Sequence, residues 1–120
     1  MIDDDEDDLF ILDQTIKNHF QHIKFIGFQH FDSLYSCLDE IDPQQIKAIF
    51  IDLNMPKVNG IEVLRKLRSD QRFKNTSKLI YSTSNNPNDI NQSLKEGADA
   101  FIVKPSKIED LVSEIEPFLN

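Results

Sequence analysis

Side chains suited to holding a metal ion or a phosphate follow four short apolar runs of the sequence. They are two acids after Met1-Ile2, one acid after residues 46–51, a hydroxyl after 79–81 and an ammonium after 100–103, namely Asp3, Asp4, Asp52, Ser82 and Lys104. If these runs are parallel strands of one sheet, their carboxyl ends lie at one edge and the five side chains converge there. Two carboxylates about 4 Å apart repel by roughly 4 kcal/mol at an effective dielectric of about 20. One lysine cannot neutralise three acids, so the cluster predicts a hard divalent cation, Mg²⁺ or Mn²⁺.

The elements that must position these side chains alternate between strands and helices. Strands are expected at residues 23–26, 46–51, 79–81 and 100–103, where apolar residues cluster. Helices are expected at 7–20, from Asp32 or Ser33 to Ile41, over a segment containing Ile61 and Leu67, from Asn88 or Asp89 to Gly97, and at 106–119. This alternation predicts right-handed crossovers and a parallel sheet. No linker or repeat divides the chain, so residues 1–120 are expected to form one α/β domain.

The first strand is the exception to this arrangement. Only Met1 and Ile2 precede the acidic residues, whereas a strand usually has about 4–6 residues. We therefore expect a truncated first strand. Either the chain is trimmed, or the natural protein has upstream residues that this chain does not include.

Composition excludes several classes of protein. The net charge of −8 disfavours binding to nucleic acids and to anionic membranes. The single cysteine excludes an internal disulfide and a cysteine-built zinc site, and three glycines leave no dinucleotide-binding or P-loop motif. No apolar run approaches the roughly 20 residues that span a bilayer, and the acidic start does not resemble a signal peptide. A cytoplasmic location is the expectation.

Four groups of residues, in order along the chain, resemble the receiver domain of two-component response regulators. They are Ile2-Asp3-Asp4, the run Ile51 to Pro56 with Asn59-Gly60, Ser82, and Gly97 to Ala100 with Lys104-Pro105. Each group alone is a weak signal, but four in order at domain-scale spacing are specific. The resemblance covers essentially the whole chain apart from the short first strand. It implies a flavodoxin-like, doubly wound, five-stranded parallel sheet of order 2-1-3-4-5 with five helices.

The resemblance also implies a metal-dependent phosphoacceptor site. Asp52 matches the phosphoacceptor, whose carboxylate attacks phosphorus. Asp4 matches a direct Mg²⁺ ligand and Asp3 a ligand that acts through water, while Asp52 and the backbone carbonyl of Asn54 complete the protein ligands. Lys104 would pair with one phosphoryl oxygen.

A switch and a slow hydrolysis are implied by the same resemblance. Ser82 would donate a hydrogen bond to the phosphoryl group while the ring of Phe101 turns inward. The family more often has tyrosine at the latter position, so we expect a less specific switch, transmitted through the fourth helix, fifth strand and fifth helix. Asn54 and Ser84 match the residues that flank the hydrolytic water. Neither is a carboxylate or a strong base, so slow loss of the phosphoryl group is predicted.

Several of these residues also have simpler structural interpretations. Asp5 to Asp8 are expected only to stabilise the start of the first helix. Thr83 is an alternative to Ser82 as the hydroxyl that contacts the phosphoryl group. Phe101 also fits an ordinary core position. The family resemblance implies a cis bond to Pro105 as one way of holding Lys104 inward. The basic segment 68–78 fits either an extended third helix or a solvated loop.

The function expected from these observations is that of a receiver rather than an enzyme. A histidine kinase or a histidine phosphotransfer protein would phosphorylate Asp52, and the modified domain would bind a downstream protein, with no direct contact to nucleic acid or membrane. One alternative is a degenerate receiver that only binds partners, which the complete set of acids and lysine disfavours. The other is an aspartate-nucleophile phosphatase, which requires an acid where this chain has Asn54.

Overall fold

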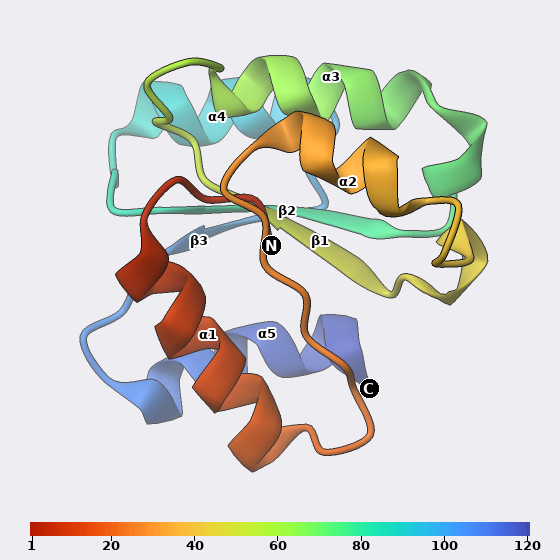
Figure 1. The fold of residues 1–120 in the computed structure, drawn as a ribbon. Coiled ribbons are helices and arrows are strands. Elements are labelled where there is room, and N and C mark those ends of the chain that lie inside the picture. The colour runs from red at the N-terminus through yellow and green to blue at the C-terminus, as the bar shows by residue number, and fades with distance from the viewer.

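Five α-helices surround a parallel sheet in the computed structural model, which describes residues 1–120 (Figure 1). The helices are α1 (Glu6–His19), α2 (Phe31–Cys37), α3 (Gly60–Ser69), α4 (Pro87–Lys95) and α5 (Ile108–Leu119), with short 3₁₀ turns η1 (Pro43–Gln45) and η2 (Gln71–Phe73). The strands are β1 (Ala48–Ile51), β2 (Ser77–Ser82) and β3 (Ala100–Val103). The expected helices and parallel sheet are thus confirmed, and no helix is long and apolar enough to cross a membrane.

The sheet has three strands in the order β1-β2-β3, so the expectation of five strands is wrong. The first two of the five expected strands are not formed. In their place are two isolated parallel bridges, in which Ile2 pairs with both Phe28 and Ile51. The Ile2 N–H donates to the Phe50 carbonyl over 2.8 Å, and the Asp52 N–H donates to the Ile2 carbonyl over 2.9 Å. The five segments expected to be strands, numbered along the chain, therefore lie side by side in the expected order 2-1-3-4-5. Only segments 3, 4 and 5 form strands, namely β1, β2 and β3.

The strand expected at residues 23–26 does not form, because the N-terminal segment that would pair with it is too short. Residues 23–26 form no strand, and their link to the N-terminal segment is a bond from the Met1 amino group to the Ile26 carbonyl over 2.8 Å. Two residues cannot extend a ladder along this whole segment. A cavity of about 490 Å³ lies between residues 23–26 and β1, and most of its lining side chains, such as Phe25 and Phe50, are apolar.

Two apolar cores cover the two faces of the sheet. On one face, Ile49 and Ile51 of β1 pack with side chains of α2 and α3, among them the fully buried Leu64. On the other face, Phe50 packs with side chains of α1 and α5, among them Leu12. Figure 1 shows the same layers, with α2, α3 and α4 on one side of the sheet and α1 and α5 on the other. Burial on both faces explains why β1 is apolar throughout.

The starts of α1 and α3 are fixed beside the ends of the N-terminal segment and β1. The Asp5 carboxylate accepts the Asp7 N–H over 2.9 Å, and Asn59 accepts the Ile61 N–H over 2.8 Å, which are helix caps. A Cβ on Gly60 would lie 2.5 Å from the Asp52 carbonyl oxygen. Glycine at this position therefore lets α3 begin directly against the end of β1.

The segment 68–78 matches neither of its two expected forms. Helix α3 ends at Ser69, and the η2 turn that follows places Phe73 fully in the core. The Lys78 ammonium is buried and donates to the carbonyls of Phe73 and Thr76 over 2.8 and 2.9 Å. The segment is therefore a short turn anchored by one aromatic ring and one lysine.

Candidate functional site

Three acids from separate parts of the chain meet at the carboxyl end of β1. Carboxylate oxygens of Asp3, Asp4 and Asp52 all lie within 4.8 Å of one another. Asp3 and Asp52 are buried and Asp4 is exposed. The bridge between Ile2 and Ile51 places Asp3 and Asp52 side by side, because each directly follows one of the bridged residues.

Burial makes Asp3 and Asp52, the two buried acids of this cluster, harder to ionise. It raises the pKa of Asp52 to about 6, with the charges of Asp3 and Asp4 adding to the rise and Lys104 opposing it. Burial also raises the pKa of Asp3, against the N–H of Asp5, which donates to its carboxylate over 2.9 Å. A divalent cation would relieve both effects, and carboxylate oxygens are the ligands that hard cations prefer. The residues present thus fit such an ion.

An open hollow lies next to the acids on the side of α3. Its volume is about 360 Å³, and Asp4, Leu53 and Asn54 are among its lining residues. Asn54, expected to supply a backbone ligand, therefore lies on the same open side as the exposed acid. This hollow gives solvent and ions a route to the cluster.

Lys104 lies among three carboxylates. Its Nζ is 2.6 Å from an oxygen of Asp8, 3.2 Å from Asp3 and 3.7 Å from Asp52, and 5.2 Å from the centre of the Tyr81 ring. Burial acts to lower the pKa of Lys104, but the bond to Asp8 and the charges of Asp52 and Asp3 outweigh it, so this pKa lies above its usual value.

The peptide bonds of the chain are all trans. The cis bond between Lys104 and Pro105 that was considered from the sequence is therefore absent. The contacts with Asp8 and Asp3 account for the inward direction of the lysine side chain.

Asp8 is the site residue that sequence reasoning missed. It was expected only to stabilise the start of α1, a role that fits the capping residue Asp5, but it makes the shortest contact of the Lys104 ammonium. The available signal was its spacing. Asp8 precedes Leu12 by four residues and Ile16 by eight, and both are buried, so it lies on the inward face of the helix.

The hydroxyl residues after β2 differ in burial. Ser82 is buried, its Oγ accepts the Ser84 N–H over 3.1 Å and its carbonyl accepts the Lys104 N–H over 2.7 Å. Thr83 is exposed, which favours Ser82 over its rival. The Ser84 hydroxyl donates to Asp89 of α4 over 2.7 Å. It is therefore engaged with the start of that helix.

Phe101 lies on β3, an edge strand of the sheet. Its backbone pairs with Ile80 of β2, and its half-buried ring packs against the core formed with α2 and α3. This position fits both a core residue and a ring that changes orientation.

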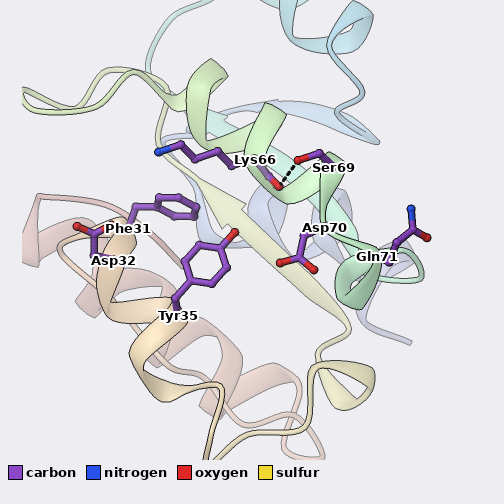
Figure 2. A pocket seen from close by; sticks show the side chains of 7 residues that line it. All are labelled: Phe31, Asp32, Tyr35, Lys66, Ser69, Asp70 and Gln71. Atoms are coloured by element: carbon purple, nitrogen blue, oxygen red, sulfur yellow. Dashed lines mark hydrogen bonds between the residues drawn. The ribbon is translucent and has the colours of Figure 1, made fainter.

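A second hollow, between α2 and the end of α3, contains none of the expected site residues (Figure 2). Its lining consists of Phe31, Asp32, Tyr35, Lys66, Ser69, Asp70 and Gln71. The Lys66 ammonium lies 5.5 Å from the centre of the Phe31 ring, and the Arg72 guanidinium 5.6 Å from that of Tyr35. The first contact joins α2 to α3, and the second joins α2 to the η2 turn.

Comparisons with known proteins find a matching family model and a similar relative. The family model of the response regulator receiver domain matches residues 1–116. Chemotaxis protein CheY1 of Helicobacter pylori is 27% identical over 115 residues, which cover 95% of this chain and 93% of that protein.

Solved structures share the same fold. Chemotaxis protein CheY4 of Vibrio cholerae superposes with a TM-score of 0.83 at 20% identity, over 98% of this chain and 94% of that chain. The Mn²⁺-bound form of response regulator Rcp1 gives a TM-score of 0.75 at 22% identity, over 98% and 89% of the two chains.

Proposed function

The chain belongs to the response regulator receiver domain family, and we propose that it accepts a phosphoryl group on Asp52 and thereby changes a protein-binding surface. One observation carries this proposal above the others. The carboxylates of Asp3, Asp4 and Asp52 lie within 4.8 Å of one another, and the Lys104 ammonium lies 3.7 Å from Asp52. This arrangement suits the transfer of a group that carries spread negative charge.

The phosphoryl donor is a phosphohistidine of a histidine kinase or of a histidine phosphotransfer protein. A bond forms from an Asp52 carboxylate oxygen to phosphorus while the bond from phosphorus to the histidine nitrogen breaks, and the nitrogen keeps the electron pair. Lys104 supplies positive charge to a phosphoryl oxygen, and the buried hydroxyl of Ser82 donates a hydrogen bond to another.

Mg²⁺ is the proposed cofactor, with Mn²⁺ as a possible substitute. Asp3, Asp4, Asp52 and the backbone carbonyl of Asn54 would hold it. The bound ion neutralises charge on the acids and on the transferred group. Support comes from the three oxygens gathered beside the open hollow.

The output surface proposed is the face formed by α4, β3 and α5. Leu94 of α4 and Val103 of β3 are exposed apolar side chains there, with 46% and 36% of their surface accessible. Ser82 and Phe101 are proposed as the switch residues that transmit the modification of Asp52 to this face. We propose no enzymatic activity beyond phosphorylation and dephosphorylation of Asp52.

Acetyl phosphate tests the proposal directly. With Mg²⁺ present, intact-mass measurements should show one added phosphoryl group on the natural chain and none on Asp52→Asn. Asp13→Asn, which removes an acid of α1 that pairs with Lys17, should be labelled like the natural chain. A folded natural chain that stays unlabelled would instead identify a degenerate receiver that only binds partners.

A further inference from the structure

We propose that Asp8 holds the Lys104 ammonium away from Asp52 in the unmodified protein and so lowers the affinity of the site for a phosphoryl group. This inference rests on the proposed function. It assigns to an acid of α1 a positioning role, exerted through the lysine.

The contacts of Lys104 favour Asp8 over the phosphoacceptor. Its Nζ is 2.6 Å from Asp8 but 3.7 Å from Asp52, so only the first is a short, charge-assisted hydrogen bond. The side chains of Lys104 and Asp8 are 12% and 27% exposed. Partial burial shields this pair from the solvent screening that weakens ion pairs on open surfaces.

The balance of charges explains why this contact matters. A divalent cation would neutralise much of the charge on Asp3 and Asp52. Asp8 would then be the carboxylate that attracts the Lys104 ammonium most strongly. A phosphoryl group then brings about two negative charges to Asp52. Lys104 must leave or share Asp8 to pair with it.

Asp8 itself is poorly placed to follow the lysine. Its helix is fixed by the cap at Asp5 and by the buried side chains Leu12 and Ile16. Lys104, in contrast, has a long side chain that can change its contact without a backbone movement. The movement therefore breaks or lengthens the bond to Asp8.

Thermodynamic linkage gives the sign of the effect. A contact that stabilises the unmodified state more than the modified state lowers the affinity for the modifying group by the difference. The charge of Asp8 also repels the incoming anion. Both effects act in the same direction, so removing the charge should strengthen binding.

Beryllofluoride, a mimic of the phosphoryl group, provides the test. Its affinity in saturating Mg²⁺ would be measured from amide chemical shifts for the natural chain and for Asp8→Asn, Asp8→Ala and Asp8→Glu. We expect the first two variants to bind about fivefold more tightly, which corresponds to the upper range for a partly exposed ion pair. Asp8→Glu, which keeps the charge, should stay close to the natural chain.

Matched variants separate the contact from the general field of charge. Asp7→Asn removes the same charge from the same turn, where no contact with Lys104 exists, and should change the affinity much less. In a Lys104→Gln background, Asp8→Asn should have no larger effect than Asp7→Asn.

Three results would overturn the inference. They are an unchanged or weaker affinity in Asp8→Asn and Asp8→Ala, an equal gain in Asp7→Asn, or a gain from Asp8→Asn in the Lys104→Gln background that exceeds the gain from Asp7→Asn. A weaker affinity would identify Asp8 as a residue that aims Lys104 productively. A natural chain that binds no beryllofluoride with Mg²⁺ present contradicts the proposed function as well, so the two failures are distinguishable.

Discussion

Lys104 and the acids around it show what single residues contribute to the site. Asp3, Asp4 and Asp52 can be predicted from sequence because each follows an apolar run that ends at the same edge of the sheet. Asp8 cannot be found in that way, since the charge of a helix start already explains an acid there. The spacing of Asp8 from the buried Leu12 and Ile16 places it on the inward face of α1, and the structure then identifies Lys104 as its partner.

The raised pKa of Asp52 predicts a pH-dependent cost in stability. The pKa of Asp52 is about 6 in the folded protein, above the usual 3.8. The folded state therefore binds the Asp52 proton more tightly than the unfolded state does. The contribution of Asp52 to the free energy of unfolding therefore falls as pH rises from about 4 to 6. Without metal, Asp52→Asn should raise that free energy by about 2 kcal/mol at pH 7 and by much less at pH 4.

Urea denaturation in EDTA at the two pH values would measure this difference. Asp13→Asn serves as the control, because its carboxylate lies on the surface of α1 and pairs only with Lys17. A gain of the same size at pH 4 and pH 7 would contradict the assignment of the cost to the ionised Asp52.

At the scale of the elements, prediction from sequence succeeds where an element needs only its own pattern. The five helices follow from the spacing of apolar residues, although α2 ends at Cys37 rather than at Ile41, and Asn86 rather than Asn88 or Asp89 caps α4. The apolar run 23–26 indicates a strand equally well, but a strand also requires a partner of similar length. Met1 and Ile2 give it a single bridge, at Phe28. The error therefore comes from pairing and not from propensity.

The junction of β1 and α3 predicts that Gly60 supports the metal site. A Cβ there would lie 2.5 Å from the Asp52 carbonyl oxygen and 2.8 Å from the Leu53 Cα, both backbone atoms that cannot easily move away. Gly60→Ala should lower the free energy of unfolding by about 2 kcal/mol, a typical cost of overpacking. It should also weaken Mg²⁺ binding, because relief of the clash displaces Asp52.

Gly27→Ala is the matched control for this change. Its Cβ would meet the Leu9 Cδ2 atom at 3.1 Å, and this side-chain methyl can shift. Urea denaturation and Mg²⁺ titration of both variants would compare the two positions. If Gly60→Ala and Gly27→Ala lower the free energy of unfolding equally and leave the Mg²⁺ affinity unchanged, the junction of β1 and α3 does not control the metal site.

At the scale of the whole molecule, the site joins distant parts of the chain. Lys104 and Asp3 are 101 residues apart in sequence, and the backbone of the N-terminal segment pairs with β1 through a single bridge, between Ile2 and Ile51. Repulsion among the acids opposes this closure in the metal-free protein, which also carries a net charge of −8. A cation bound by Asp3, Asp4 and Asp52 would thus act as a link between the N-terminus and β1.

Mg²⁺ should therefore raise the midpoint of thermal unfolding. A ligand that binds only the folded state stabilises it by about 2.7 kcal/mol at a concentration 100-fold above its dissociation constant. Asp4→Asn should remove most of this gain and change the metal-free protein little, because Asp4 is exposed. Scanning calorimetry with Mg²⁺, and with NaCl at matched ionic strength, separates binding from screening of the net charge. An equal rise with NaCl, or an undiminished rise in Asp4→Asn, would show that Mg²⁺ acts on the molecule as a whole and not at the three acids.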